Sequence, residues 1–320
     1  NYPEANIRHY RFLLEGLKET ETALEKRKIS FTMQHGHPAD VALDLGKNAS
    51  LLVCDRGYLR HQKAWRERVA KEAKCPVVQV ESDVVVPVEV ASPKEEIGAR
   101  TLRPRIHRQW DFYLQSLRAK RVKRSARRLH LKSDVDPADP DTALRRLRVS
   151  REVAPVRRFR GGRTEARRRL NNFLRGGLRG YAEGRSEPGD WHSSLLSPYL
   201  HFGQISALEV ALAVRRARAG SRGDRAALLE ELVVRRELAV NFVYYSRVYD
   251  SYRSLPGWAA KSLERHRRDP RPALYSRARL ESADTHDPYW NAAMREMVHT
   301  GFMHNYMRMY WGKKILEWSR

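Results

Sequence analysis

The chain has 320 residues, 41% of them hydrophobic and 31% charged, and its net charge of +24 favours a globular protein with a polyanionic partner, most often nucleic acid. No stretch approaches the ~18 consecutive apolar residues of a membrane-spanning helix, so we expect no association with a membrane. Two cysteines, Cys54 and Cys75, are too few for a disulfide framework, and we expect them to be buried free thiols in a reducing cytoplasm.

The first hundred residues alternate between helical and strand patterns. Apolar residues recur with a period of about 3.6 from Ile7 to Lys26, which predicts a helix. The run Leu51–Cys54 is continuously apolar, as is typical of a strand buried on both faces. The alternation predicts a parallel, Rossmann-like sheet flanked by helices, and because the pattern opens with a helix we expect at least one strand before Asn1. The other predicted elements here are a strand at Ile29–Met33, a short helix at Pro38–Leu45, a helix at Tyr58–Ala73 and a strand at Pro76–Val80.

Helical patterns dominate from about Glu95 to Arg320, but the extended stretch Lys132–Asp141 interrupts them, because Pro137 and Pro140 break helices. Residues 101–180 hold 24 Lys and Arg against 7 Asp and Glu. A solvated arginine-rich surface would explain one basic run, but the whole segment favours contact with nucleic acid, because such contact releases counterions from phosphates. We predict three parts: an α/β domain at residues 1–100, a basic connector at 101–145 and an all-helical domain at 146–320.

Three hydroxyl groups precede an apolar segment in the run Ser193–Pro198. A serine beside a proline is a helix-start signal, and a helix start with spare hydroxyl and N–H groups is suited to binding phosphate. An ordinary helix cap needs the same residues, so the pattern alone leaves both interpretations open.

An acidic residue interrupts the predicted buried helix that runs through Glu230–Leu238. Glu231 lies one turn before Arg235, and an ion pair between them on a solvated face is one interpretation. The other is a carboxylate in a cleft, where it accepts a hydrogen bond from a base or donates one when protonated.

The segment His299–Trp311 carries polar residues on an otherwise apolar helix. Asn305, Arg308 and Met309 share one face of that helix. A buried arginine there needs an anion or a carbonyl group as its partner. The histidines of this segment show no metal-binding spacing.

Three tryptophans lie in or near this segment. Trp311 and Trp318 are two helical turns apart, ~10 Å along one face, and Trp290 lies upstream. Aromatic residues in such a stripe are usually core residues, and electron transfer is the alternative.

Three stretches in this order resemble the photolyase/cryptochrome family, specifically the class II cyclobutane pyrimidine dimer photolyases. The stretch Ser193–Ser206 resembles the flavin-phosphate segment of that family, and Glu231–Tyr245 resembles its lesion-site helix. Thr285–Trp311, continuing to Trp318, is similar to the longest class II signature. A weaker likeness extends back through Val88–Trp110 to the start of the chain.

The resemblance implies an α/β antenna domain followed by an all-helical domain that holds FAD in a bent form. By matching position, Glu231, Asn305 and Met309 would face the flipped-out dimer, and Glu231, Asn305 and Arg308 would also lie against the flavin. Trp311, Trp290 and Trp318 would form the electron-transfer chain, with Trp311 nearest the flavin. The remaining residues that the resemblance assigns to FAD are Tyr181, Ser193, Ser194, Leu196 and Ser197.

The implied activity is light-driven repair of cyclobutane pyrimidine dimers, in which reduced FAD passes an electron to the dimer and later recovers it. The implied partner is ultraviolet-damaged DNA, bound by a monomer in the cytoplasm, or in the nucleus of a eukaryote. The resemblance also implies an antenna pigment, either 8-hydroxy-5-deazaflavin or methenyltetrahydrofolate.

By comparison with the family pattern, we expect the chain to lack the first strands of the antenna domain and the segment after Trp318. Two other functions remain open at this point. One is a cryptochrome-like blue-light photoreceptor without repair activity, and the other is a basic helical nucleic-acid-binding protein without flavin.

Overall fold

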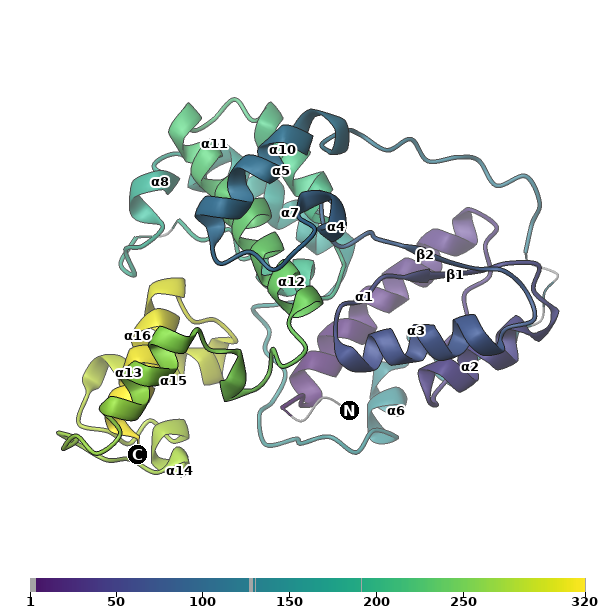
Figure 1. Cartoon of the computed structure of the whole chain (residues 1–320). Helices are drawn as coiled ribbons and strands as arrows, with labels where there is room; N and C mark the ends of the chain where they lie inside the picture. The colour runs from purple at the N-terminus through teal and green to yellow at the C-terminus, as the bar shows by residue number, and fades with distance from the viewer. Residues whose placement is uncertain (1–3, 127–128, 130, 191, 320) are drawn as a thin grey trace.

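The computed structural model describes residues 4–126, 129, 131–190 and 192–319 (Figure 1). A small α/β region comes first, as the sequence predicts, and in the described residues after it the regular elements are helices joined by loops, some of them long. Within the described residues, no helix combines the length and the apolar composition needed to cross a bilayer.

The α/β region contains two parallel strands whose register pairs Leu52 with Val77. Two of the predicted helices have the predicted bounds, Ile7–Lys26 and Pro38–Leu45. Figure 1 shows α2 and α3 side by side below the strands. The elements are α1 (Ile7–Lys26), α2 (Pro38–Leu45), η1 (Gly46–Asn48), β1 (Leu52–Asp55), α3 (Arg60–Glu72) and β2 (Val77–Val80).

Two predictions about this region are wrong. Ile29–Met33 is not a strand, because its hydrogen bonds go to the connector: the Ser30 hydroxyl donates to Ala126 O at 2.6 Å and Asp134 N donates to Met33 O at 3.1 Å. The strand β1 is not buried on both faces either. Val53 is 59% exposed, since in the described chain the sheet has two strands and lacks cover on that side.

The two cysteines are free, as predicted, but neither is fully buried. Cys54 lies on β1 and Cys75 just before β2, and both side chains are partly exposed. Both cysteines are partly exposed because the described sheet has two strands and lacks cover on one side.

The helical region is built around one large core. Leu102 and Ile106 of α5 are fully buried in this core, beside Tyr199 and Val233. Two segments have π-helical geometry, which is rare and often marks functional sites. The elements are α4 (Val88–Ala91), α5 (Ala99–Tyr113), α6 (Pro140–Arg145), α7 (Arg163–Asn172), η2 (Phe173–Gly177), α8 (Tyr181–Gly184), α9 (Ser197–His201), α10 (Ala207–Arg216), α11 (Arg222–Leu229), η3 (Glu230–Arg235) and α12 (Arg236–Tyr245).

Polar side chains of α12 hold the segment that follows β2. The Glu237 carboxylate accepts the backbone N–H of Val85 at 2.6 Å. One turn further along, Asn241 accepts the N–H of Glu96 at 2.8 Å, and Tyr245 donates to Ser92 O at 2.6 Å. These contacts fasten the segment after the sheet to the helix that continues from η3.

The last part of the chain forms a separate group of helices (Figure 1). Its small core contains Leu280, Trp290 and Trp318. Arg8 of α1 reaches this group and donates to the carbonyl oxygens of Met297 and Val298 at 3.0 and 2.6 Å. These carbonyls lie in the last turn of a helix, where Met297 O also accepts the N–H of the C-cap Gly301 at 2.9 Å. The elements are η4 (Tyr252–Ser254), α13 (Gly257–Arg265), α14 (Arg277–Glu281), α15 (Pro288–Thr300) and α16 (Asn305–Trp318).

Candidate functional site

One cavity of about 1100 Å³ lies where α1, η3 and the segments around α9 and α16 meet. Small-molecule sites usually enclose ~300–1,000 Å³, so this volume is enough for a large cofactor. The three stretches that carry the family resemblance all reach its wall. The predicted site residues that line the cavity are Tyr181, Ser193, Ser194, Ser197, Glu231, Asn305 and Arg308.

Other predicted site residues lie outside the wall. Leu196 is packed in the main core and is 3% exposed. Met309 is 50% exposed, Trp290 and Trp318 lie in the core of the last helices, and Trp311 is partly buried against that core. Arg308 is exposed, contrary to the expectation of a buried arginine, and no carboxylate in the described chain forms an ion pair with it. Because Arg308 is exposed at the cavity rim, water can hydrate its guanidinium and an anionic partner is not required.

The serine segment approaches the cavity through an unusual backbone turn. Leu195 has a φ of +56°, in the left-handed region that non-glycine residues avoid, and such strain is concentrated at functional sites. Leu196 is the N-cap of α9, with a side chain that cannot accept a hydrogen bond, so the serines do not serve as its cap. In the described chain, no hydrogen bond occupies the hydroxyls of Ser193 and Ser197, and both are available to a ligand.

Glu231 points to the cavity from the π-helical segment η3. Its carboxylate forms an ion pair with Arg185 at 2.9 Å. The predicted pair with Arg235 does not form, because Arg235 bonds Glu230 at 3.3 Å, and Glu230 also pairs with Arg103 at 2.7 Å. Adjacent residues on a helix point about 100° apart, so Glu230 faces Arg103 and Arg235 while Glu231 faces Arg185 and the cavity.

The cavity wall is strongly basic. The six arginines in it outnumber the two glutamates, Glu15 and Glu231, and arginine is well suited to bind phosphate oxygens in pairs. Burial lowers the pKa of His9 and of His304, so these imidazoles are neutral and the arginines supply the charge. The arginines are Arg8, Arg11, Arg157, Arg160, Arg185 and Arg308.

Sequence reasoning missed most of this basic wall. Arg8, Arg11 and Glu15 come from α1, which we assigned to the α/β domain rather than to the site. Their spacing places them on one face of that helix, and this was the only signal in the sequence. Arg185 was also missed, since nothing near it in the chain indicates that it reaches Glu231.

The three tryptophans contact one another in a row. The rings of Trp311 and Trp290 are stacked at 4.6 Å with an angle of 20°, and Trp290 lies 5.5 Å from Trp318. Trp290, which lies on α15, therefore connects Trp311 and Trp318, which both lie on α16. Its indole N–H donates to Leu280 O at 3.0 Å, whereas the buried indole N–H of Trp311 has no partner.

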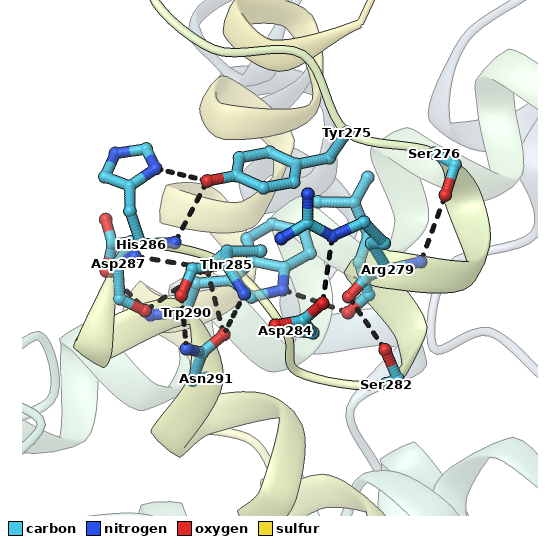
Figure 2. A network of polar contacts seen from close by, with 11 residues as sticks. Tyr275, Ser276, Arg279, Ser282, Asp284, Thr285, His286, Asp287, Trp290 and Asn291 are labelled. Carbon is cyan, nitrogen blue, oxygen red and sulfur yellow. Dashed lines mark hydrogen bonds and ion pairs between the residues drawn. The ribbon is translucent and has the colours of Figure 1, made fainter.

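A polar network lies around Trp290, the middle residue of this row (Figure 2). The Asp287 carboxylate caps α15 by accepting the N–H of Trp290 at 2.9 Å, and it also accepts the hydroxyl of Tyr310. Asn291 and Thr285 are joined by hydrogen bonds, the shortest of them 2.8 Å long. The network fixes the position of Trp290. Across the described residues, no group of three or more His, Cys, Asp or Glu side chains could hold a metal ion.

Comparison with known proteins agrees with this architecture. The family model described as DNA photolyase matches residues 2–126. A protein of Methanothermobacter thermautotrophicus named deoxyribodipyrimidine photo-lyase is 46% identical over 320 residues, which are 100% of this chain and 69% of that protein. A protein of the same name from Potorous tridactylus is 37% identical over 99% of this chain and 59% of its own length. The chain therefore spans three fifths to two thirds of the length of these relatives.

Solved structures share the fold at low sequence identity. A cryptochrome of Synechocystis sp. PCC6803 has a TM-score of 0.71 at 19% identity, covering 98% of this chain and 68% of the other. An archaeal photolyase from Sulfolobus tokodaii, solved with two FAD molecules, has a TM-score of 0.66 at 15% identity, covering 99% of this chain and 69% of the other.

An α/β region followed by helices, with an arginine-lined cavity beside a row of tryptophans, places the molecule among proteins of the photolyase/cryptochrome fold. The 46% identity to the Methanothermobacter photo-lyase, over the whole chain, identifies the family within this fold. The chain belongs to the DNA photolyase family.

Proposed function

We propose that the protein repairs cyclobutane pyrimidine dimers in DNA by light-driven electron transfer from reduced FAD. The observation that carries the proposal is the meeting of the serine segment, Glu231 and Arg308 at one basic cavity beside the tryptophan row. The names of the two curated relatives support the same activity.

FAD fits the residues of the cavity. Its pyrophosphate requires anion-binding groups, and the wall offers Arg157, Arg160 and Arg308 together with the unoccupied hydroxyls of Ser193 and Ser197, while Arg8, Arg11 and Arg185 are held by other protein groups. Tyr181 and Ser194 would complete the hold on the cofactor, with Leu196 supporting the segment from the core. Bound FAD would supply the light-absorbing electron donor, while the protein would supply position and charge. Arg308 would stabilise negative charge on the ring system.

Residues at the cavity rim would receive the damaged bases. A dimer must leave the duplex to reach a cofactor in a cavity, and flipping costs less for a damaged base. Glu231 and Asn305 would make hydrogen bonds to it, and the exposed Met309 would pack beside it. Arg185 would keep Glu231 in place through the 2.9 Å ion pair.

The tryptophan row would supply electrons to the cofactor. Trp311 would be the nearest donor, with Trp290 and Trp318 behind it, and their ring contacts of 4.6 and 5.5 Å leave no gap in the chain. This order follows the positions that the class II resemblance assigns, and we extend the proposal to class II membership.

The partners follow from the charge and the family. The basic surface would bind phosphates on both sides of the lesion, and a monomer would suffice for that contact. We propose that the protein works on DNA in the cytoplasm or the nucleus, with 8-hydroxy-5-deazaflavin or methenyltetrahydrofolate as antenna pigment.

A repair assay tests the proposal. The purified protein is loaded with FAD, the flavin is chemically reduced, and irradiated DNA is added in blue light or in darkness. We expect dimers to disappear only in the light, and Glu231→Ala to slow their loss while a matched exposed control, Glu264→Ala, does not. Flavin uptake without any light-dependent loss of dimers would support a cryptochrome-like photoreceptor. A protein that takes up no flavin would contradict both functions.

A further inference from the structure

We propose that the end of α1 and the connector beside it form a second DNA-binding surface, which holds the duplex to one side of the lesion. The inference rests on the proposed function, because the duplex here is the flank of the damaged substrate. Seven exposed basic side chains make up this surface, which we call the arm surface: Lys26, Arg27, Lys28, Lys120, Arg121, Lys123 and Arg124. In the described chain none of the seven lines the cavity, so the arm surface would contact phosphates and not the damaged bases.

Backbone hydrogen bonds hold the two segments of the arm surface side by side. The Arg27 guanidinium donates to Lys120 O at 3.1 Å, and the N–H of Ala126 donates to Lys28 O at 2.9 Å. Figure 1 shows the connector passing this end of α1. Because these bonds use backbone atoms of the connector, its basic side chains stay exposed to solvent.

The arm surface collects charges of one sign without neutralising them. In the described residues, no carboxylate lies within ion-pair distance of any of the seven cations. Burial and the charges of Glu25 and Asp136 raise the pKa of Glu21, on the same helix, so this carboxyl is not neutralised by the arm surface either. Repulsion among the cations costs stability, and a polyanion bound across both segments would relieve it.

Lys28 occupies a backbone position that favours glycine. Its φ is +63°, and the bonds from Lys28 N to Glu25 O and from Ile29 N to Leu24 O, 2.9 and 3.0 Å long, close the end of α1 in a Schellman motif. Glycine is the usual residue at this position, because a side chain there strains the backbone. Such strain is concentrated at functional sites, and here it keeps one more positive charge beside the connector.

The length of the connector segment suits the spacing of phosphates along DNA. Residues 120–124 belong to no helix or strand, and four residue steps of extended chain span at most ~13 Å. One strand of a duplex carries a phosphate for every ~3.4 Å of helix axis, so this span covers about four phosphates. The segment offers four cations for them: Lys120, Arg121, Lys123 and Arg124.

The arm surface lies too far from the cavity to touch the lesion itself. Glu15 is the last residue of α1 in the cavity wall, and Arg27 follows it by twelve residues, or ~18 Å along the helix. That distance corresponds to ~5 base pairs of duplex. A duplex with its lesion at the cavity therefore reaches the arm surface only when it extends at least that far to one side.

Fluorescence anisotropy of labelled duplexes at a series of salt concentrations tests the proposal. The test variant replaces the four connector cations: Lys120→Gln, Arg121→Gln, Lys123→Gln and Arg124→Gln. We expect it to bind a duplex of about 30 base pairs, with or without a central dimer, at least ~10-fold more weakly at about 0.1 M salt. The slope of log K against log salt should fall by ~0.9 for each lost phosphate contact. Binding of a dimer-containing duplex of about 10 base pairs, which ends before the arm surface, should stay unchanged.

A matched control removes four exposed arginines that also lie outside ion-pair distance of carboxylates in the described chain, near the junction of α10 and α11. This control should leave the slope unchanged, and it consists of Arg215→Gln, Arg216→Gln, Arg218→Gln and Arg222→Gln. Lys28→Gly should raise the urea midpoint by relieving the strained backbone and yet lower the slope by ~0.9. Stability and DNA binding would then change in opposite directions, which a purely structural role of Lys28 does not produce.

An unchanged slope in the connector variant, or an equal loss in the arginine control, would overturn the inference. An equal loss of binding to the short duplex would also overturn it, because that duplex does not reach the arm surface. If the connector variant loses binding to a duplex RNA of the same length but not to DNA, the choice of DNA as partner is wrong. DNA binding that depends on the arm surface, in a protein that fails the light-dependent repair assay, would overturn the proposed function alone.

Discussion

The buried Glu237 leads to a prediction about the contact between the sheet region and α12. Its side chain is 3% exposed, and its carboxylate oxygens accept the N–H groups of Val85 and Val86 at 2.6 and 3.3 Å. Burial raises the pKa of this carboxyl from 4.5 to about 8, although the two backbone N–H groups act against the rise. Glu237 is therefore mainly protonated in the folded protein at neutral pH.

The direction of the pH effect follows from proton binding. Between the unfolded pKa of 4.5 and the folded pKa of about 8, the folded state binds more protons at Glu237 than the unfolded state does. The free energy of unfolding therefore falls as the pH rises through this window. At 1.36 kcal/mol per unit, the rise from 4.5 to about 8 corresponds to about 5 kcal/mol. Glu237→Gln removes the titrating proton at nearly constant volume and should remove that slope.

Urea unfolding at a series of pH values measures the effect. Relative to the unsubstituted protein, we expect Glu237→Gln to gain stability steadily as the pH rises from 4.5 to about 8. Glu264→Gln, at an exposed position on α13, serves as the control and should leave the profile unchanged. Parallel profiles for the unsubstituted protein and Glu237→Gln would refute the argument that burial controls this carboxyl.

Three further predictions concern the cap of α11, the tryptophan row and the cavity rim. Backbone N–H groups, foremost those of Ala182 and Ser221, hold the pKa of Asp224 at about 2, so Asp224→Ala should destabilise the protein at neutral pH. In acid unfolding curves, the difference in stability between the two proteins should shrink as the pH falls from 3.8 toward 2, and a constant difference would argue against this role. Trp311→Phe should block photoreduction of oxidised flavin and spare repair by chemically reduced flavin, and unchanged photoreduction would remove Trp311 from the chain. Glu231→Ala should lower the repair yield with an unaltered flavin absorption spectrum, whereas loss of bound flavin would assign Glu231 a structural role.

Much of the fold could be predicted because local signals agreed with tertiary packing. The period of apolar residues in α1 and the proline at the start of α2 set bounds that the structure reproduces. Ile29–Met33 had an equally good strand pattern, but its partners come from the connector around Ser133, about 100 residues away. An apolar run likewise does not reveal what covers the strand that it forms. The exposure of one face of β1 could therefore not be predicted from the run Leu51–Cys54. The domain boundaries remain predictions.

The site was predictable only in part. Motifs identified the serine segment, Glu231 and Arg308, and the structure brings these together at one cavity. The contribution of α1 depends on Arg8 meeting Met297, a contact between residues 289 positions apart that no local pattern encodes. The π-helical geometry of Glu230–Arg235 was also unpredictable, because no residue type specifies it. The roles of the individual site residues remain to be tested by the variants above.

The most direct test of the account is a titration of FAD into the purified protein, followed by flavin fluorescence. Ser193→Trp places a large ring in the wall of the cavity, and Ser262→Trp places the same ring on the exposed surface of α13. The account predicts saturable binding to the unsubstituted protein and to Ser262→Trp, with binding lost in Ser193→Trp. Equal binding by all three proteins would mean that the flavin is held elsewhere and would contradict the assignment of this cavity.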